Sequence, residues 1–338
     1  MKRVDSKKVV LSGIRATGSL HMGNYLGALR HFVSLSKDET KKCFFFVANL
    51  HTLTTKTDPD DIKRDLREIV LDFVSVGVNP NTSSIFAQSS VPETCELAWL
   101  LNCLTPVADL ERMPHFKEKR DKKVALGEIV NAGLLTYPVL MAADILGPRA
   151  NLVPVGEDQH PHVELARELA RRFNTVFGET FPIPELLANE AVRVPGLDGA
   201  GKMGKSDQNT IDLADSPETV KKKFAQAVTD PARKRKSDPG DPSKCNVYAF
   251  HSLVSSSEDI KKVHEGCRTA GIGCIECKGI ISGYISDILA PIQQRRAELN
   301  RKGSEYALEI LAEGGKRARK IIAETVAEAK DRMGVPFY

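Results

Sequence analysis

The sequence contains no long hydrophobic run, and this absence excludes a membrane-spanning protein. Its longest apolar run, Cys43 to Ala48, is far shorter than the roughly 20 residues that a transmembrane helix needs. The basic stretch Met1 to Lys8 is not followed by an apolar segment long enough for a secretory signal peptide. We therefore expect a cytoplasmic protein that does not associate with membranes.

The chain also lacks a strong excess of charge of either sign. Its 338 residues carry a net charge of +4, with 27% charged and 41% apolar residues, a composition typical of soluble globular proteins. This mildly basic balance is compatible with nucleic acid binding but does not favour it by itself. The length is sufficient for two or three domains with a substantial core.

Short apolar runs alternate with helical patterns over the first two thirds of the chain. The predicted strands are Val9–Ser12, Cys43–Ala48, Ser84–Gln88 and Leu152–Val155. The predicted helices are Leu26–Leu35, Asp61–Val76, Thr94–Leu104, Val130–Ile145 and Pro161–Phe173. This alternation predicts an α/β fold with a parallel sheet and helices on both of its faces.

Strand patterns disappear after about Ser206, and helical patterns take over. The charged, alanine-rich segment Glu305–Met333 is predicted to be helical, and we expect Gly314 and Gly315 to split it into two helices. The predicted organisation has three parts, an α/β domain over 1–206, a helical region over 207–300, and C-terminal helices over 301–338 that pack back on the first domain.

Two glycine-containing segments carry groups that suit phosphate binding. His21-Met22-Gly23-Asn24 lies where the first predicted strand turns into a helix, a place where helix N–H groups face an anion. The loop from Gly196 to Asn209 holds Lys202 and Lys205, whose mobile ammonium groups suit a polyphosphate. The spacing of this loop differs from that of a Walker phosphate loop.

Together the two segments resemble the signatures of class I aminoacyl-tRNA synthetases, usually written HIGH and KMSKS. Here they read His21-Met22-Gly23-Asn24 and Lys202-Met203-Gly204-Lys205-Ser206, so Asn24 replaces the second His and Gly204 replaces the first Ser. The stretches LLTYPVLMAADIL from Leu134, VPVGEDQHPHVELARELARRFN from Val153, LERMPHFKEK and VTDPARKRKSDPG resemble the tryptophanyl-tRNA synthetases more narrowly. The resemblance implies a Rossmann-type, doubly wound parallel sheet as the catalytic domain and a mainly helical C-terminal domain.

The same resemblance implies a homodimeric ligase. It would use ATP and Mg²⁺ to activate L-tryptophan as tryptophanyl-adenylate, and would then transfer tryptophan to tRNA(Trp). The catalytic residues would be His21, Asn24, Lys202 and Lys205. The ATP-binding residues would be Arg15, Gly23, Asn24, Gly156, Asp158, Lys202, Met203, Lys205 and Ser206. A tyrosyl-tRNA synthetase and a non-catalytic RNA-binding paralogue are the alternatives.

Asp144 is a lone carboxylate on an otherwise apolar predicted helix. Because an unpaired buried carboxylate is costly, one interpretation is an ion pair with a neighbouring helix. The other, implied by the resemblance, is a hydrogen bond from the indole N–H of bound tryptophan, which would reject tyrosine and phenylalanine. The other implied tryptophan-binding residues are His51, Tyr137, Met141, Val153, Val155 and Gln159. Met141 and the two valines have core packing as an alternative role, and Asp158 and Gln159 a helix-capping turn.

Four of the seven cysteines lie close together late in the chain, at Cys245, Cys267, Cys274 and Cys277. In a cytosolic protein such a group indicates a metal site more than disulfides. Four thiolates suit either a structural Zn²⁺ or a [4Fe–4S] cluster. The resemblance to a subset of tryptophanyl enzymes favours the [4Fe–4S] cluster, next to the anticodon-binding region.

Overall fold

The structure is a computed structural model that describes residues 7–55, 58–188 and 192–335. Its centre is a parallel sheet of five strands in the order β3-β2-β1-β4-β5. The strands are β1 (Lys8–Arg15), β2 (Lys41–Ala48), β3 (Ser84–Ala87), β4 (Leu152–Val155) and β5 (Glu185–Ala188). Because β2 and β3 lie on one side of β1 while β4 and β5 lie on the other, the topological switch point is between β1 and β4. Ligands bind at this point in doubly wound sheets, at the carboxyl ends of the strands.

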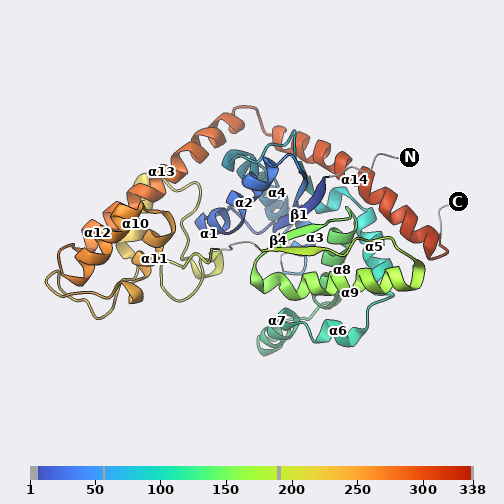
Figure 1. The fold of residues 1–338 in the computed structure, drawn as a ribbon, viewed down its shortest axis with the longest axis horizontal. Helices are drawn as coiled ribbons and strands as arrows, with labels where there is room; N and C mark the ends of the chain where they lie inside the picture. Colours follow the sequence, from blue (N-terminus) through green and yellow to red (C-terminus); the bar gives the residue numbers. More distant parts are fainter. Residues whose placement is uncertain (1–6, 56–57, 189–191, 336–338) are drawn as a thin grey trace.

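Helices cover both faces of the sheet, and further helices extend to one side of it (Figure 1). The helices of the α/β part are α1 (Met22–Asn24), the π-helical turn η1 (Tyr25–Leu29), α2 (Arg30–Ser36), α3 (Asn49–Thr52), α4 (Pro59–Val76), α5 (Glu93–Asn102), α6 (Val107–Glu111), α7 (Pro114–Ala125), α8 (Ala132–Leu146) and α9 (His160–Phe177). Short 3₁₀ turns are η2 (Gln88–Ser90), η3 (Glu157–Gln159), η4 (Lys205–Asp207) and η5 (Pro242–Lys244). The later helices are α10 (Pro217–Gln226), α11 (Asn246–Val254), α12 (Ser257–Arg268), α13 (Cys274–Asn300) and α14 (Tyr306–Arg332).

The phenylalanine run of β2 contributes to the core on both faces of the sheet. Successive side chains of a strand point to opposite faces, so Phe45 lies on one side while Phe44 and Phe46 lie on the other. Phe45 stacks on Phe32 with ring centroids 4.6 Å apart. Since β2 is paired on both edges and covered on both faces, a continuous apolar run is what this position requires.

The predicted α/β class is confirmed, with one strand missed. The four predicted strands and the five predicted helices are present with shifts of a few residues at their ends. The missed strand β5 pairs in parallel with β4. It is short, and its sequence, ELLA, has neither the alternation nor the β-branched residues that mark a strand. Among the described residues, none of the helices combines the length and apolarity needed to cross a membrane.

The expected division of 305–333 into two helices is wrong, because α14 is one continuous helix through Gly314 and Gly315. Both glycines are buried where α14 packs on β3. A Cβ at Gly314 would lie 1.8 Å from the carbonyl oxygen of Ile85, so only glycine allows this approach. The helix therefore lies directly against the α/β part of the chain. The domain boundaries predicted at 206 and 300 stay a prediction.

Replacing Gly314 with alanine is expected to destabilise the fold by about 1–3 kcal/mol, because the methyl group forces α14 away from β3. Gly283 in α13 is the matched control, since it is exposed and nothing lies within 4 Å of a Cβ placed there. Gly283→Ala should stabilise the protein by about 0.5–1 kcal/mol through helix propensity alone. Urea denaturation of both variants measures the difference. Equal free energies of unfolding would contradict the close contact.

Candidate active site

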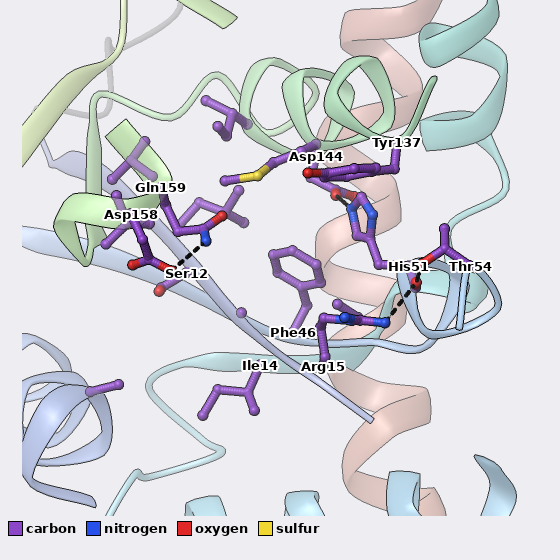
Figure 2. Close-up of a pocket in the computed structure, with 18 of the residues that line it drawn as sticks. Ser12, Ile14, Arg15, Phe46, His51, Thr54, Tyr137, Asp144, Asp158 and Gln159 are labelled. Carbon is purple, nitrogen blue, oxygen red and sulfur yellow. Dashed lines mark hydrogen bonds and ion pairs between the residues drawn. The ribbon is translucent and has the colours of Figure 1, made fainter. Parts of the chain in front are cut away.

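A cavity of about 740 Å³ opens at the carboxyl ends of the strands, next to the switch point between β1 and β4. Figure 2 shows Arg15, Ser12 and Ile14 from β1, Phe46 from β2, and Tyr137 and Asp144 from α8 around it. Eleven of the predicted site residues line this cavity: Arg15, Asn24, His51, Tyr137, Met141, Asp144, Val153, Val155, Asp158, Gln159 and Lys202. Among the described residues, His21, Gly23, Gly156, Met203 and Lys205 were also predicted but do not contribute to its wall.

The two signature segments nevertheless pack against each other. Met22 N–H donates to the Ile211 carbonyl at 2.8 Å, and Leu213 N–H donates to the Leu20 carbonyl at 3.0 Å. A Cβ at Gly23 would lie 2.8 Å from His21 Nδ1 and 3.3 Å from Met203 Cβ, so glycine is needed where the segments meet. The contact brings the first turn of α1 beside the lysine loop. The side chain of Ser206 lies outside the part of the chain that the structure describes.

Asn24 completes the start of the first helix. Its Oδ1 accepts a hydrogen bond from His21 N–H at 3.1 Å, which satisfies one of the free donors at the helix N-terminus. The amide hydrogens of Asn24 are then available to an acceptor in the cavity that this residue lines. The structure thus shows the local cap, and the donor role predicted from the sequence stays a prediction.

His21 is buried beside the ammonium group of Lys205. Burial first, and the positive charge of Lys205 second, lower the pKa of His21 to about 4. Its ring is therefore neutral at neutral pH and able to donate from one nitrogen only. The Lys205 ammonium itself donates to the carbonyl of Thr17 at 2.9 Å.

His21→Asn should reduce the acid sensitivity of the fold. The unfolded chain binds a proton at His21 as the pH falls below about 6.5, whereas folded His21 stays neutral down to about 4. The stability that His21 contributes above pH 6.5 is therefore lost across this window. Urea denaturation between pH 6.5 and 4 should show a shallower fall in the free energy of unfolding for His21→Asn than for wild type. Parallel curves would contradict the shifted pKa.

The deep end of the cavity contains a buried carboxylate with two side-chain partners. Gln88 Nε2 donates to both Asp144 oxygens at 2.9 Å, and His51 Nε2 lies 2.9 Å from Asp144 Oδ2. Burial raises the pKa of Asp144, while hydrogen bonds from His51 and Gln88 oppose that rise. The first interpretation of Asp144 was an ion pair with a neighbouring helix, and His51 of α3 is such a partner. Asp144 also lines the cavity, as the second interpretation, a contact with the indole, requires.

Tyr137 lies to one side of this carboxylate network. Its hydroxyl and His162 Nε2 are 2.8 Å apart, and its ring packs edge-on to His51 at 6.1 Å between centroids. Burial raises the pKa of Tyr137 to about 12, so the phenol stays neutral. The Tyr137 hydroxyl is therefore a neutral polar group on the same helix as Asp144.

The turn after β4 carries Gly156, Asp158 and Gln159. Gln159 Nε2 donates to Asp158 Oδ2 at 2.9 Å, and neither side chain caps the helix that follows. A Cβ at Gly156 would lie 2.8 Å from Asp158 Oδ1, so a larger residue here would require the Asp158 carboxylate to move. The capping alternative for this turn is therefore not what the structure contains.

Several lining residues were missed from the sequence, and two of them are Lys119 and Phe46. Lys119 comes from α7 and lies over the Tyr137 ring, with Nζ 5.5 Å from its centroid. Burial lowers the pKa of Lys119 and of Arg15, which donates to the His51 carbonyl at 3.3 Å. Phe46 is the second of these two residues, and its β2 position had marked it only as core. Lys119, Arg15 and Lys202 give the cavity three cationic side chains, and Glu118, Asp144 and Asp158 give it three acidic ones, so its wall offers partners for both anionic and cationic groups of a ligand.

The four late cysteines lie near one another at helix ends. Cys245 precedes α11, Cys267 is near the end of α12, and Cys274 and Cys277 are in the first turn of α13. Burial, and then the charges of the other three thiols, raise the pKa of Cys277 to about 12. Arg233 Nη1 lies 3.7 Å from Cys267 Sγ, and His251 Nε2 lies 3.4 Å from Cys277 Sγ. Within the described ranges, these and other His, Cys, Asp and Glu side chains do not form a group of three or more already placed to hold a metal ion.

Comparison with known proteins agrees with this geometry. The family model described as class I tRNA synthetases (W and Y) matches residues 3–289. The tryptophan–tRNA ligase of Deinococcus radiodurans is 44% identical, covering 96% of this chain and 98% of the relative, and that of Thermotoga maritima is 42% identical, covering 97% and 99%. The crystal structure of Campylobacter jejuni tryptophanyl-tRNA synthetase complexed with ADP and tryptophan has a TM-score of 0.84 at 36% identity, covering 96% of this chain and 99% of that one. The chain therefore belongs to the class I tRNA synthetases of the tryptophan and tyrosine group, and within it to the tryptophan–tRNA ligases.

Proposed function

We propose that this chain activates L-tryptophan with ATP and transfers it to tRNA(Trp), using the cavity at the switch point for the first step. The observation that carries the proposal is one cavity with a buried carboxylate, Asp144, at its deep end and cationic side chains elsewhere in its wall. The carboxylate suits the indole N–H of tryptophan, and the cations suit the phosphates of ATP.

In the first step, a carboxylate oxygen of tryptophan attacks the α-phosphorus of ATP. The bond from that phosphorus to the β-phosphate oxygen breaks, and pyrophosphate leaves. No protein nucleophile is needed, so the residues act by positioning and by stabilising charge. Mg²⁺ bound with ATP would share the phosphate charge.

The ATP side of the site is assigned to the two signatures and the turns around them. Asn24 and neutral His21 donate hydrogen bonds to phosphate oxygens, and the N-terminus of α1 adds its dipole. Gly23 allows adenine to approach the backbone. Lys202 and Lys205 follow the departing pyrophosphate as their loop closes. The remaining ATP-binding residues are Arg15, Gly156, Asp158, Met203 and Ser206.

The tryptophan side is assigned to the residues around Asp144. This carboxylate accepts the indole N–H, and phenylalanine is disfavoured because its ring leaves that acceptor unpaired. Tyr137, Met141, Val153 and Val155 flank the ring, and Gln159 binds the α-amino group. His51 orients Asp144 through the 2.9 Å contact. In the second step a terminal ribose hydroxyl of tRNA attacks the adenylate carbonyl and releases AMP.

The four cysteines fit a metal or cluster in their chemistry. Their thiols are soft ligands, partly buried, and near enough to one another to raise the pKa of Cys277. We assign Cys245, Cys267, Cys274 and Cys277 to a [4Fe–4S] cluster, with structural Zn²⁺ as the alternative. Such a group supplies cross-links between α11, α12 and α13 rather than a reaction step.

The assembly is assigned as a cytoplasmic homodimer. Large apolar side chains are exposed from α5 to the segment before α8, with Trp99 69% and Ile129 83% exposed. Exposed apolar surface of this kind is typical of a contact between subunits. A monomeric mass in solution at micromolar concentration would contradict the dimer.

One assay tests the function. Exchange of labelled pyrophosphate into ATP, run with tryptophan and with tyrosine in parallel, should be stimulated by tryptophan alone. Stimulation by tyrosine would favour the tyrosyl alternative. An absence of exchange with both, in protein that binds tRNA, would favour a non-catalytic RNA-binding role.

A further inference from the structure

Gln88 lies behind the cavity and connects two of its buried polar residues, His51 and Asp144. Its side chain is 1% exposed, at the start of η2 directly after β3, and it does not line the cavity. Its Oε1 accepts hydrogen bonds from the backbone N–H groups of Leu50 and His51, at 3.1 and 3.2 Å. Its Nε2 donates to both oxygens of Asp144 at 2.9 Å. Every contact of this amide therefore involves α3 or Asp144.

These contacts determine which way round the amide is held. Two N–H donors face Oε1, so the NH₂ group is the end that meets Asp144. A group that receives hydrogen bonds on both oxygens is held as an acceptor. This matters because burial pushes Asp144 toward its protonated form by raising its pKa, and a protonated carboxyl donates one hydrogen bond. The indole N–H of tryptophan is itself only a donor and needs an acceptor.

We propose that Gln88 is a positioning residue for substrate recognition, which keeps Asp144 ionised and aimed so that it accepts the indole N–H. The proposal rests on the proposed function, because it requires Asp144 to contact the indole. Gln88 acts through Asp144 and does not touch the substrate. Its loss should therefore harm amino acids that present a ring N–H and spare those that do not.

The alternative is a purely structural role, in which Gln88 only joins η2 to α3. A matched pair of residues makes the same junction without touching Asp144. Asn49 Nδ2 donates to Ser89 Oγ at 2.8 Å, and Ser89 N–H donates to Asn49 Oδ1 at 3.1 Å. Asn49→Ala thus removes contacts between the same two segments and serves as the control.

The experiment compares tryptophan with L-3-benzothienylalanine, in which sulfur replaces the ring N–H. Full-length variants are assayed by pyrophosphate exchange, and the measured quantity is the ratio of kcat/KM for the two amino acids. Gln88→Met should lower kcat/KM for tryptophan about tenfold or more and that for benzothienylalanine about twofold or less. Asn49→Ala should leave the ratio at its wild-type value. An equal loss for both amino acids in Gln88→Met would overturn the proposal.

Gln88→Glu provides a second test that does not depend on the fate of Gln88→Met. When the introduced carboxyl is protonated, it can still donate to Asp144 while its other oxygen accepts from Leu50 and His51. When that carboxyl is ionised, it cannot donate and it repels the carboxylate of Asp144. The preference of Gln88→Glu for tryptophan should therefore fall as the pH rises from about 6 to 9, beyond any change in wild type. A ratio in Gln88→Glu that follows the wild-type pH profile would overturn the proposal.

Asp144→Ala, which removes both acceptor oxygens, separates this proposal from the function on which it rests. If Asp144→Ala leaves the ratio unchanged, Asp144 does not contact the indole, and the assignment of the tryptophan site fails together with the role of Gln88. If Asp144→Ala lowers the ratio but Gln88→Met does not, the tryptophan site stands and only the role of Gln88 fails.

Discussion

Replacing Lys205 with alanine is expected to lower kcat for tryptophan-dependent pyrophosphate exchange about a hundredfold, with little change in KM for ATP. The structure places the Lys205 ammonium beside His21, in contact with the Thr17 carbonyl, at the junction of the two signatures. Negative charge moves onto pyrophosphate as its bond to the α-phosphorus breaks. A cation at that point is therefore worth more in the transition state than with ATP merely bound.

The split between kcat and KM is the informative measurement for Lys205. A rise in KM with kcat unchanged would mean that Lys205 stabilises the ground state and the transition state equally. That result would contradict a catalytic role for Lys205. Lys221 on α10 is a suitable control, because it is an exposed lysine outside the cavity wall. Lys221→Ala should leave exchange unchanged, which excludes a general effect of net charge.

Most of the sheet was predictable, because a strand that is buried on both faces appears in the sequence as a continuous apolar run. The run Cys43 to Ala48 must be apolar throughout, since β2 is enclosed by neighbouring strands and by helices on both faces. The sequence of strand β5 contains no such continuous apolar run. It lies at the edge of the sheet, pairs only with β4, and needs few side chains of its own to be held there.

Gly314 and Gly315 show a different limit of sequence reading. Glycine lowers helix propensity, so a pair of glycines reads as a break. Here each glycine lowers the helix propensity of α14 but lets the helix make close contact with a segment far away in the sequence. The residues around Gly314 do not show whether a glycine pair ends a helix or allows it to pack closely. That depends on Ile85, which comes from another part of the chain.

The candidate site likewise contains residues that could be predicted from the sequence and one, Gln88, that could not. His51, Tyr137 and Asp144 were found through resemblance, and the structure brings all three into one cavity wall. Gln88 was visible only as the polar end of a predicted strand, because its role depends on a contact with α8. Polar residues at the carboxyl ends of parallel strands are worth inspecting for this reason, since both of the Asp144 partners follow such strands.

If the four late cysteines hold the proposed [4Fe–4S] cluster, replacing Cys274 with serine is expected to abolish it. Wild-type protein purified without oxygen should be brown, with roughly four irons per chain, and Cys274→Ser should be colourless. The matched control is Cys103→Ser, because Cys103 is an exposed free thiol outside the group of four and should leave the colour unchanged.

The functional consequence follows from the position of these cysteines on α13. Cys274 and Cys277 begin this helix, whereas its other end holds the catalytic part: Gln293 donates to the carbonyls of Leu213 and Asp215, and Arg296 pairs with Glu68 and Asp72. Loss of the proposed cluster should loosen the cysteine end of α13 before the end that holds Gln293 and Arg296. Cys274→Ser should therefore weaken tRNA charging severalfold while sparing pyrophosphate exchange.

The metal content decides between the remaining explanations. One Zn²⁺ per chain in a colourless wild-type protein would refute the cluster but keep the cross-link between α11, α12 and α13. If anaerobic preparations contain neither iron nor zinc, both fail. Equal losses of exchange and charging in Cys274→Ser would mean that the cysteines support the whole fold rather than one end of α13, because charging needs tRNA and exchange does not.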